Sequence, residues 1–198
     1  MKPLRRLTIR ALVGTLAALT LIQPAGAQLD PTRMRVIDGA IHDRLSTQGD
    51  VWFEAGDYLK SIQSLRAAQS LDPADYEIAT DLGWMLENVL AWDEALATYV
   101  RYRKSNPNDP DAAYPEANFY FMKKSYLEIP ALLEPMLKMA RPPHANTFRI
   151  LAHAYDRLGL FADSKRVWDQ LLAVDPNDEA AKVNLKKVEA KLKGGTSK

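Results

Sequence analysis

The chain of 198 residues contains no cysteine. This absence excludes disulfide bonds, thiolate zinc sites, iron–sulfur clusters and a cysteine nucleophile. It also excludes a bacterial lipoprotein anchor, which requires a cysteine to carry the lipid. An excess of charge of one sign is equally lacking, because 26 Lys and Arg balance 25 Asp and Glu. The composition therefore offers no electrostatic basis for binding nucleic acid or an anionic membrane surface.

Sequence motifs that carry known chemistry are also missing. The three histidines, His42, His144 and His153, do not form a His-Glu-x-x-His metal site. The chain has no Gly-x-Ser-x-Gly nucleophile elbow and no Gly-x-x-x-x-Gly-Lys phosphate loop. The segments 106–111 and 175–179 are rich in Asp and Asn, but they lack the central glycine and distant glutamate of a calcium loop. We therefore expect a protein that is not an enzyme and that uses neither a metal nor a cofactor.

The first 27 residues have the composition of a cleavable signal peptide. No acidic residue occurs in its first part, where the basic residues are Lys2, Arg5, Arg6 and Arg10. An uncharged run of 12 residues follows at 11–22. That run is shorter than the roughly 20 residues that a membrane-spanning helix needs. Residues 25–27, Ala-Gly-Ala, fit the small-x-small pattern that signal peptidase accepts and predict cleavage before Gln28.

Removal of this segment would leave a chain with a small negative net charge. The 171 remaining residues carry 22 basic and 25 acidic groups, a net charge of −3. They contain no second apolar run long enough to span a membrane. We expect an exported protein, either periplasmic or secreted.

Two markers recur every 34 or 35 residues through the rest of the chain. The first is an aromatic residue, found at Tyr58, Trp92, Tyr126 and Phe161. The second is an Asx-Pro pair, found at Asp72-Pro73, Asn106-Pro107 and Asp175-Pro176; its prolines are 34 and then 69 residues apart, so the third period lacks the pair. Within each period the apolar spacing is helical, and a proline disfavours helix at the residue before it. The pattern predicts pairs of antiparallel helices.

In these repeats the chain resembles the tetratricopeptide repeat family. The first helix of that family's repeat carries four signature positions in order: a large residue, a leucine, a glycine or alanine, and a tyrosine. The second helix carries a small residue, an aromatic residue, an alanine and a proline. Residues 145–178 match best, at Phe148, Leu151, Ala152, Tyr155, Gly159, Phe161, Ser164, Trp168 and Pro176. Residues 76–109 match at Leu82, Gly83, Trp92, Ala95, Tyr99 and Pro107. Residues 42–75 match at Leu45, Gly49, Trp52, Gly56, Tyr58, Ser61, Leu65, Ala68 and Pro73.

The resemblance, which covers about residues 42–178, implies an all-α fold. The expected architecture is a right-handed α-solenoid of about four helix-turn-helix repeats with a C-terminal capping helix. Its repeats would be 42–75, 76–109, 110–144 and 145–178. We also expect a helical lead-in at 28–41, the capping helix at 179–193 and a disordered tail at 194–198. Small residues such as Gly49, Gly83, Ala95 and Ala152 would let the two helices of a pair approach closely.

The third repeat, 110–144, departs from the family pattern. Lys124 stands where a turn glycine is usual, and Pro130 and Pro135 lie in the expected second helix. Pro130 is tolerated in a first turn, whereas Pro135 would remove an interior hydrogen bond and kink or shorten the helix. Two interpretations stay open: a degenerate repeat held by its neighbours, or a local widening that shapes a binding site.

The resemblance also implies a binding surface, because the first helix of each repeat lines a concave groove in this family. By register, the candidate contacts are Asp50, Phe53, Glu54, Asp81, Trp84, Glu87, Asn88, Asn118, Phe121, Arg149, His153 and Arg157. This groove would run from acidic, through aromatic, to partly basic. Phe53, Trp84 and Phe121 are not signature packing positions, so they either face a ligand or pack against adjacent helices.

These features predict a non-catalytic protein-interaction scaffold or adaptor of the bacterial cell envelope. The expected partner is an envelope protein or peptide held in the groove, not nucleic acid. Chaperone-binding members of the family clamp a carboxylate with a Lys and Asn pair, and Ser46 and Asp50 stand at those positions, so that role is not expected. Two alternatives stay open: an accessory protein of glycan assembly or export, and a self-assembling structural module.

Overall fold

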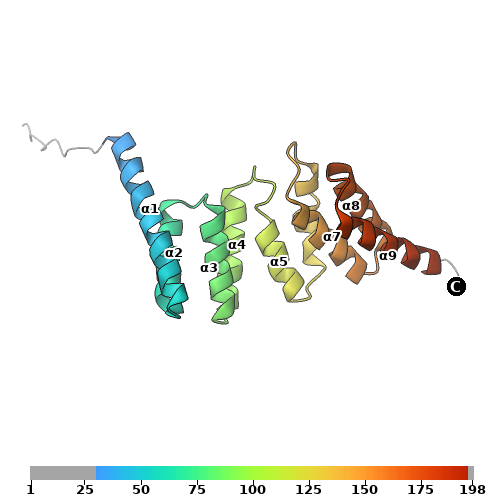
Figure 1. Cartoon of the computed structure of the whole chain (residues 1–198), viewed down its shortest axis with the longest axis horizontal. Coiled ribbons are helices and arrows are strands. Elements are labelled where there is room, and N and C mark those ends of the chain that lie inside the picture. The colour runs from blue at the N-terminus through green and yellow to red at the C-terminus, as the bar shows by residue number, and fades with distance from the viewer. Residues whose placement is uncertain (1–29, 196–198) are drawn as a thin grey trace, which may run out of the picture.

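A computed structural model describes residues 30–195, and all the regular structure in that range is helical. The first helices are α1 (Pro31–Glu54), α2 (Tyr58–Leu71), α3 (Tyr76–Asn88), α4 (Trp92–Ser105) and α5 (Tyr114–Met122). They are followed by α6 (Glu128–Leu133), a 3-10 turn η1 (Met136–Lys138), α7 (Ala145–Arg157), α8 (Phe161–Val174) and α9 (Glu179–Gly195). Figure 1 shows the helices side by side in one elongated row from α1 to α9. The prediction of an all-α solenoid is confirmed.

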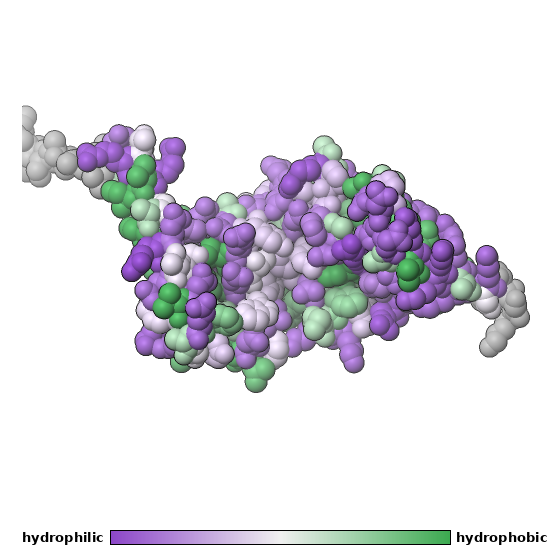
Figure 2. Space-filling view, viewed as in Figure 1, coloured by the Kyte–Doolittle hydropathy of each residue, from purple (hydrophilic) through white to green (hydrophobic). Residues whose placement is uncertain are grey.

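Helix α1 is one continuous helix that contains both the expected lead-in and the first helix of the first repeat. Asp30 caps the helix, because its Oδ1 accepts a hydrogen bond from Thr32 N at 3.0 Å, and Pro31 suits the first position. The helix is 24 residues long, and its first part projects beyond α2 (Figure 1). Figure 2 shows apolar surface on this projecting part, where the exposed apolar residues are Met34, Val36, Ile37 and Ile41.

Two end segments of the sequence need separate mention. The predicted signal peptide, 1–27, and residues 196–198 of the predicted tail lie outside the described residues. Helix α9 includes Gly194 and Gly195, so the expectation that the tail begins at residue 194 is corrected for these two positions. Continuing an existing helix forms one more backbone hydrogen bond per residue, which offsets the cost of about 1 kcal/mol for each glycine.

Small residues lie where the two helices of a pair cross. The backbone carbonyl of Gly49 accepts a hydrogen bond from Ser61 Oγ at 2.8 Å. The same bond recurs in the last pair, where Ser164 Oγ donates to the carbonyl of Ala152 at 2.8 Å. All four residues are buried. The close approach predicted from these small residues is therefore present, and in these two pairs a buried serine satisfies its hydroxyl on the facing backbone.

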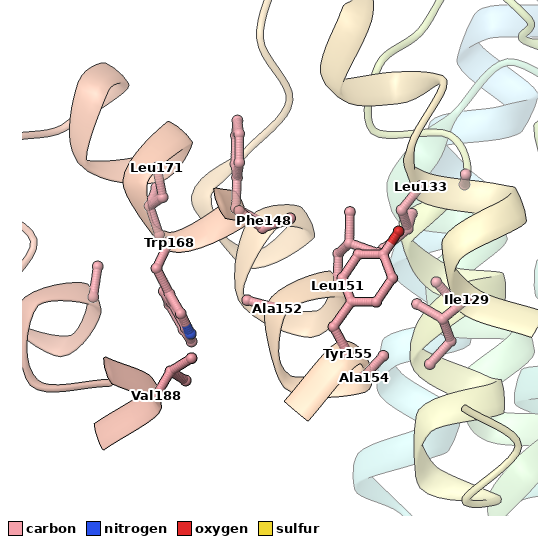
Figure 3. Packing of buried hydrophobic residues seen from close by; sticks show 14 residues of the cluster. Ile129, Leu133, Phe148, Leu151, Ala152, Ala154, Tyr155, Trp168, Leu171 and Val188 are labelled. Carbon is pink, nitrogen blue, oxygen red and sulfur yellow. The ribbon is translucent and has the colours of Figure 1, made fainter. Parts of the chain in front are cut away.

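Two hydrophobic cores meet at α5. The first lies among α2, α3 and α4 and includes Ile62, Leu65, Leu82 and Leu86. The second lies among α5 to α9, and Figure 3 shows Ile129 and Leu133 beside Leu151 and Tyr155, with Trp168, Leu171 and Val188 further along. On α5, Phe119 belongs to the first core and its neighbour Tyr120 packs against both. The third pair thus connects the two halves of the stack.

The helices of the third pair are short. Helix α5 has 9 residues and α6 has 6, against 13 and 14 in the second pair. Pro130 lies in the first turn of α6, where its missing N–H removes no helical bond. Helix α6 ends at Leu133, and Pro135 begins the 3-10 turn η1. The predicted shortening at Pro135 is confirmed.

Each of the four turns within a helix pair contains one residue with a left-handed backbone. These residues are Gly56 (φ 77°), Leu90 (φ 64°), Lys124 (φ 60°) and Gly159 (φ 75°), and they recur at the repeat period. Glycine adopts this conformation without steric cost, but a side chain brings Cβ too close to the carbonyl oxygen. The second and third turns are therefore strained.

Relief of this strain is testable at Leu90. The variant Leu90→Gly is expected to raise the free energy of unfolding by about 1 kcal/mol. Leu90 is 68% exposed, so little packing is lost with its side chain. Urea unfolding followed by circular dichroism measures the change. Gly159→Leu is the matched control, because it introduces the same strain and should lower stability by about the same amount. A loss of stability in Leu90→Gly would contradict the assignment.

Candidate functional site

Three adjoining cavities open beside the first helices of the second and third pairs. The aromatic cavity, of about 310 Å³, is lined by Phe53, Tyr58, Trp84, Met85 and Asn88. The central cavity, of about 380 Å³, is lined by Tyr76, Thr80, Trp84, Glu87, Tyr99, Tyr114, Pro115, Asn118 and Met122. The tyrosine–aspartate cavity, of about 470 Å³, is lined by Tyr76, Asp109, Asp111, Tyr114, His144 and Asn146. Neighbouring cavities share Trp84, or Tyr76 and Tyr114, so the three form one continuous groove.

An exposed cluster of three aromatic rings forms the aromatic cavity. Trp84 contacts Phe53 edge to face, with ring centroids 5.6 Å apart, and Phe53 lies 5.7 Å from Tyr58. Trp84 is 50% exposed despite its size. Asn88 Nδ2 donates to the Trp84 carbonyl oxygen at 2.8 Å and leaves the amide oxygen to the groove. Phe53 and Trp84 thus face solvent rather than the core, and so does Tyr58, one of the recurring aromatic residues.

The central cavity combines this indole with two polar side chains. Glu87 accepts a hydrogen bond from the Tyr99 hydroxyl at 2.8 Å. Burial and this carboxylate raise the pKa of Tyr99 well above its usual value, so the hydroxyl stays protonated and donates. Asn118 is half-buried, and within residues 30–195 its amide makes no hydrogen bond. Glu87 is therefore partly structural, while Asn118 has its full hydrogen-bonding capacity available.

Three carboxylates predicted for the groove lie on its first helices but do not line the three cavities. Asp50, Glu54 and Asp81 are exposed side chains on α1 and α3. Partial desolvation raises the pKa of Asp81, and the nearby carboxylates of Asp50, Glu77 and Asp75 raise it further. The charged groups that act on Asp81 are thus other carboxylates, so the surface around Asp81 is negatively charged.

The tyrosine–aspartate cavity joins the starts of three first helices. Asp109 accepts hydrogen bonds from the Tyr102 hydroxyl at 2.9 Å and from the backbone of Asp111 at 3.1 Å. Asp111 accepts from the backbone N–H of His144 at 2.6 Å. Burial, followed by Tyr114, Asp111 and Asp109, raises the pKa of Tyr76 to about 12. The two aspartates are thus fixed in place by neighbouring loops.

Sequence reasoning missed this third cavity. The sequence excludes a calcium loop in segment 106–111, which contains Asp109 and Asp111, but it does not predict that Tyr76 and His144 line a cavity with them. The cavity arises because loops one period apart lie next to each other, as the bond between Asp111 and His144 shows. The sequence does contain a signal for this cavity: the acidic loop 106–111 lies one repeat period before the loop that contains His144.

Phe121 does not line the groove. Its ring lies 5.3 Å from Tyr126 and packs against the second core, so of the two alternatives for Phe121 the structure shows the packing one. Met122, one residue further, lines the central cavity instead. One residue along a helix turns the side chain by about 100°, so Met122 lines the cavity while Phe121 packs against the second core.

The expected basic end of the groove also lies elsewhere. Arg149 donates to Asp178 at 2.6 Å and to Asn146 at 2.7 Å, and so it ties α7 to the start of α9. The His153 ring contacts Trp168 at 5.1 Å, and burial lowers its pKa. Arg157 is exposed at the end of α7, outside the three cavities. None of these three residues lines the three cavities, and their role in binding stays a prediction.

Two further absences concern residues 30–195. In this range no three His, Asp or Glu side chains are grouped so that they could hold a metal ion. None of the helices described is both long and apolar enough to cross a bilayer.

Known structures share this arrangement of helices. No protein-family model and no curated protein matches the sequence. A tetratricopeptide repeat protein from Parabacteroides merdae is similar, with a TM-score of 0.64 and 18% identity over 78% of this chain and 61% of that one. This chain therefore spans less than two thirds of that protein. The pilF protein of Pseudomonas aeruginosa has a TM-score of 0.63 and 16% identity over 79% of this chain and 71% of its own. MamA from Desulfovibrio magneticus has a TM-score of 0.56 and 17% identity over 78% of this chain and 92% of its own.

Proposed function

We propose that this chain, which has the tetratricopeptide repeat fold, is a non-catalytic scaffold or adaptor of the bacterial cell envelope that binds a protein or peptide segment in its groove. The observation that carries the proposal is the exposed aromatic cluster of Phe53, Tyr58 and Trp84. Contact between water and three neighbouring rings is unfavourable, and a partner that covers them removes that cost. Aromatic side chains in pockets also contribute most to protein–protein binding energies.

The polar groups of the groove suit an extended segment. Asn118 and Asn88 each offer amide hydrogen-bonding capacity beside the aromatic surface. An amide both donates and accepts, so it can pair with the backbone of a bound peptide. The envelope location rests on residues 1–27, whose composition is that of a signal peptide.

The variant Trp84→Ala tests the proposal. Envelope proteins captured by the purified chain are identified, and the affinity of each purified partner is measured by calorimetry. Loss of the indole is expected to weaken binding by at least about tenfold. Val183→Ala is the matched control, because Val183 is also 50% exposed but lies on α9 outside the groove. A folded Trp84→Ala variant with unchanged affinity would contradict the assignment of the groove.

The same complex separates the two alternatives. A basic peptide beside Asp50 and Asp81 should bind more weakly as salt rises, because ions screen exposed charges. A sugar stacked on Trp84 should bind almost independently of salt. Self-assembly would instead give a mass that increases with protein concentration in sedimentation.

A further inference from the structure

We infer that the tyrosine–aspartate cavity binds a guanidinium or ammonium group, and that Arg141 occupies part of this site in the free protein. The inference rests on the proposed function, because the cation would belong to the segment held in the groove. Beyond the proposed function, the cavity would thus select a cationic group of the ligand, and Arg141 of the chain itself would compete with that group.

The cavity has the two components that a cation site requires. Asp109 and Asp111 supply carboxylates, and Tyr76 and Tyr114 supply aromatic walls. Carboxylates pair with guanidinium through strong charge-assisted hydrogen bonds, and aromatic faces attract cations through their quadrupole. The volume of about 470 Å³ suits the end of a side chain rather than a bare ion.

Arg141 pairs with Asp109 at the edge of this cavity, but the described residues that line it include no Lys or Arg. The Nδ1 atom of His144 accepts a hydrogen bond from the backbone N–H of Asn146 at 3.2 Å. The lining therefore carries the two carboxylates of Asp109 and Asp111 and no Lys or Arg of its own.

Arg141 demonstrates that a guanidinium fits these carboxylates. Its Nη2 lies 3.0 Å from Asp109 Oδ1 and 4.0 Å from Asp111 Oδ2. Arg141 reaches them from the segment between η1 and α7, and its side chain is 69% exposed. An exposed ion pair of this kind contributes little to stability, so a ligand cation can replace it.

An organic cation is favoured over a metal ion. Asp111 Oδ1 is already used by the backbone of His144, and Asp109 Oδ2 by the Tyr102 hydroxyl. Over residues 30–195, no cluster of three acidic or histidine side chains is arranged for a metal. Asp109 Oδ1 accepts from both the Asp111 backbone and Arg141, and Asp111 Oδ2 lies 4.0 Å from the same guanidinium nitrogen.

The position of the cavity suits a segment that also covers Trp84. The tyrosine–aspartate and central cavities share Tyr76 and Tyr114, and the central cavity shares Trp84 with the aromatic cavity. A segment with an apolar residue on Trp84 would place a basic residue further along the groove. The preferred partner sequence therefore combines an apolar residue with a nearby Lys or Arg.

Two probe peptides that differ only in charge test this inference. Acetyl-Leu-Ala-Ala-Arg-amide and its citrulline counterpart are titrated into the full chain and followed by NMR chemical shifts. The arginine peptide is expected to bind about tenfold more tightly. Asp111→Asn should remove most of this preference, because the amide oxygen can still accept from His144 but carries no charge. Asp93→Asn, which removes an exposed charge from α4, is the control.

Arg141→Ala has the opposite expected effect. Removal of the internal competitor should strengthen binding of the arginine peptide about threefold, without changing the fold. Equal binding of both peptides, no binding of either, or weaker binding in Arg141→Ala would overturn the inference. If these results occur while Trp84→Ala still weakens the protein partner, the groove stands and the cation site fails. If the arginine preference persists while Trp84→Ala has no effect, the groove fails and the cation site stands.

Discussion

Replacement of Gly83 by alanine is expected to lower the free energy of unfolding by about 3 kcal/mol, although alanine is the better helix former. A Cβ atom at Gly83 would lie on the ring of Tyr99, well inside van der Waals contact. Tyr99 is 5% exposed and its hydroxyl is bonded to Glu87, so the ring cannot move aside without losing packing and that bond. The loss is measured by urea unfolding.

Gly49→Ala is the control for this variant. Gly49 occupies the corresponding position in the first pair, but an added Cβ would meet the Leu65 side chain at 3.5 Å, an ordinary contact. We expect Gly49→Ala to keep or raise stability by up to about 1 kcal/mol, because alanine restricts the unfolded chain. Equal losses in both variants would contradict the specific clash with Tyr99.

Arg149→Ala is expected to lower the free energy of unfolding by about 3 kcal/mol. The Asp178 side chain is 3% exposed, and Arg149 is its ion-pair partner at 2.6 Å. Removal of the arginine leaves a buried carboxylate without a countercharge. Arg157→Ala is the control, because it removes an exposed arginine from the same helix and should change stability by less than about 0.5 kcal/mol. The double variant Arg149→Ala/Asp178→Asn should recover much of the loss.

The effect of Arg149→Ala depends on pH. Burial alone would raise the pKa of Asp178, but hydrogen bonds from the Ala181 backbone and Arg149 hold it below 3.8. In the wild type this stabilisation is present above pH 3.8 and is lost as the pH falls through the lower folded pKa. In the variant, protonation removes the unpaired charge. The difference in stability between the two proteins should therefore shrink below about pH 4.

Most of the architecture follows from two local patterns. Aromatic and Asx-Pro residues at one period, with helical apolar spacing between them, predict the paired helices that the structure contains. Pro135 also predicts the early end of α6, because proline acts on the backbone of its own segment. Such effects are readable from sequence since they involve residues near each other in the chain.

The predicted groove residues Phe53, Trp84 and Asn118 lie beside the cavities, because α1, α3 and α5 keep the repeat geometry there. Their role in binding stays a prediction. Register alone could not reveal that Arg149 pairs with Asp178, 29 residues later, at the start of α9. Nor could it bring Asp111 to His144, a contact between loops one repeat apart. These misses involve long-range contacts.

The junction of the two cores at α5 has a consequence for cooperativity. In a linear array each unit is stabilised mainly by its neighbours, so a short central pair is the place where the two halves can open separately. Tyr120 and the ion pair between Arg103 and Glu116 are among the links across this joint. The groove crosses the same joint, from Trp84 to Asn146. A segment bound in the groove would therefore hold the two halves together, and amide hydrogen exchange should become slower in both halves at once.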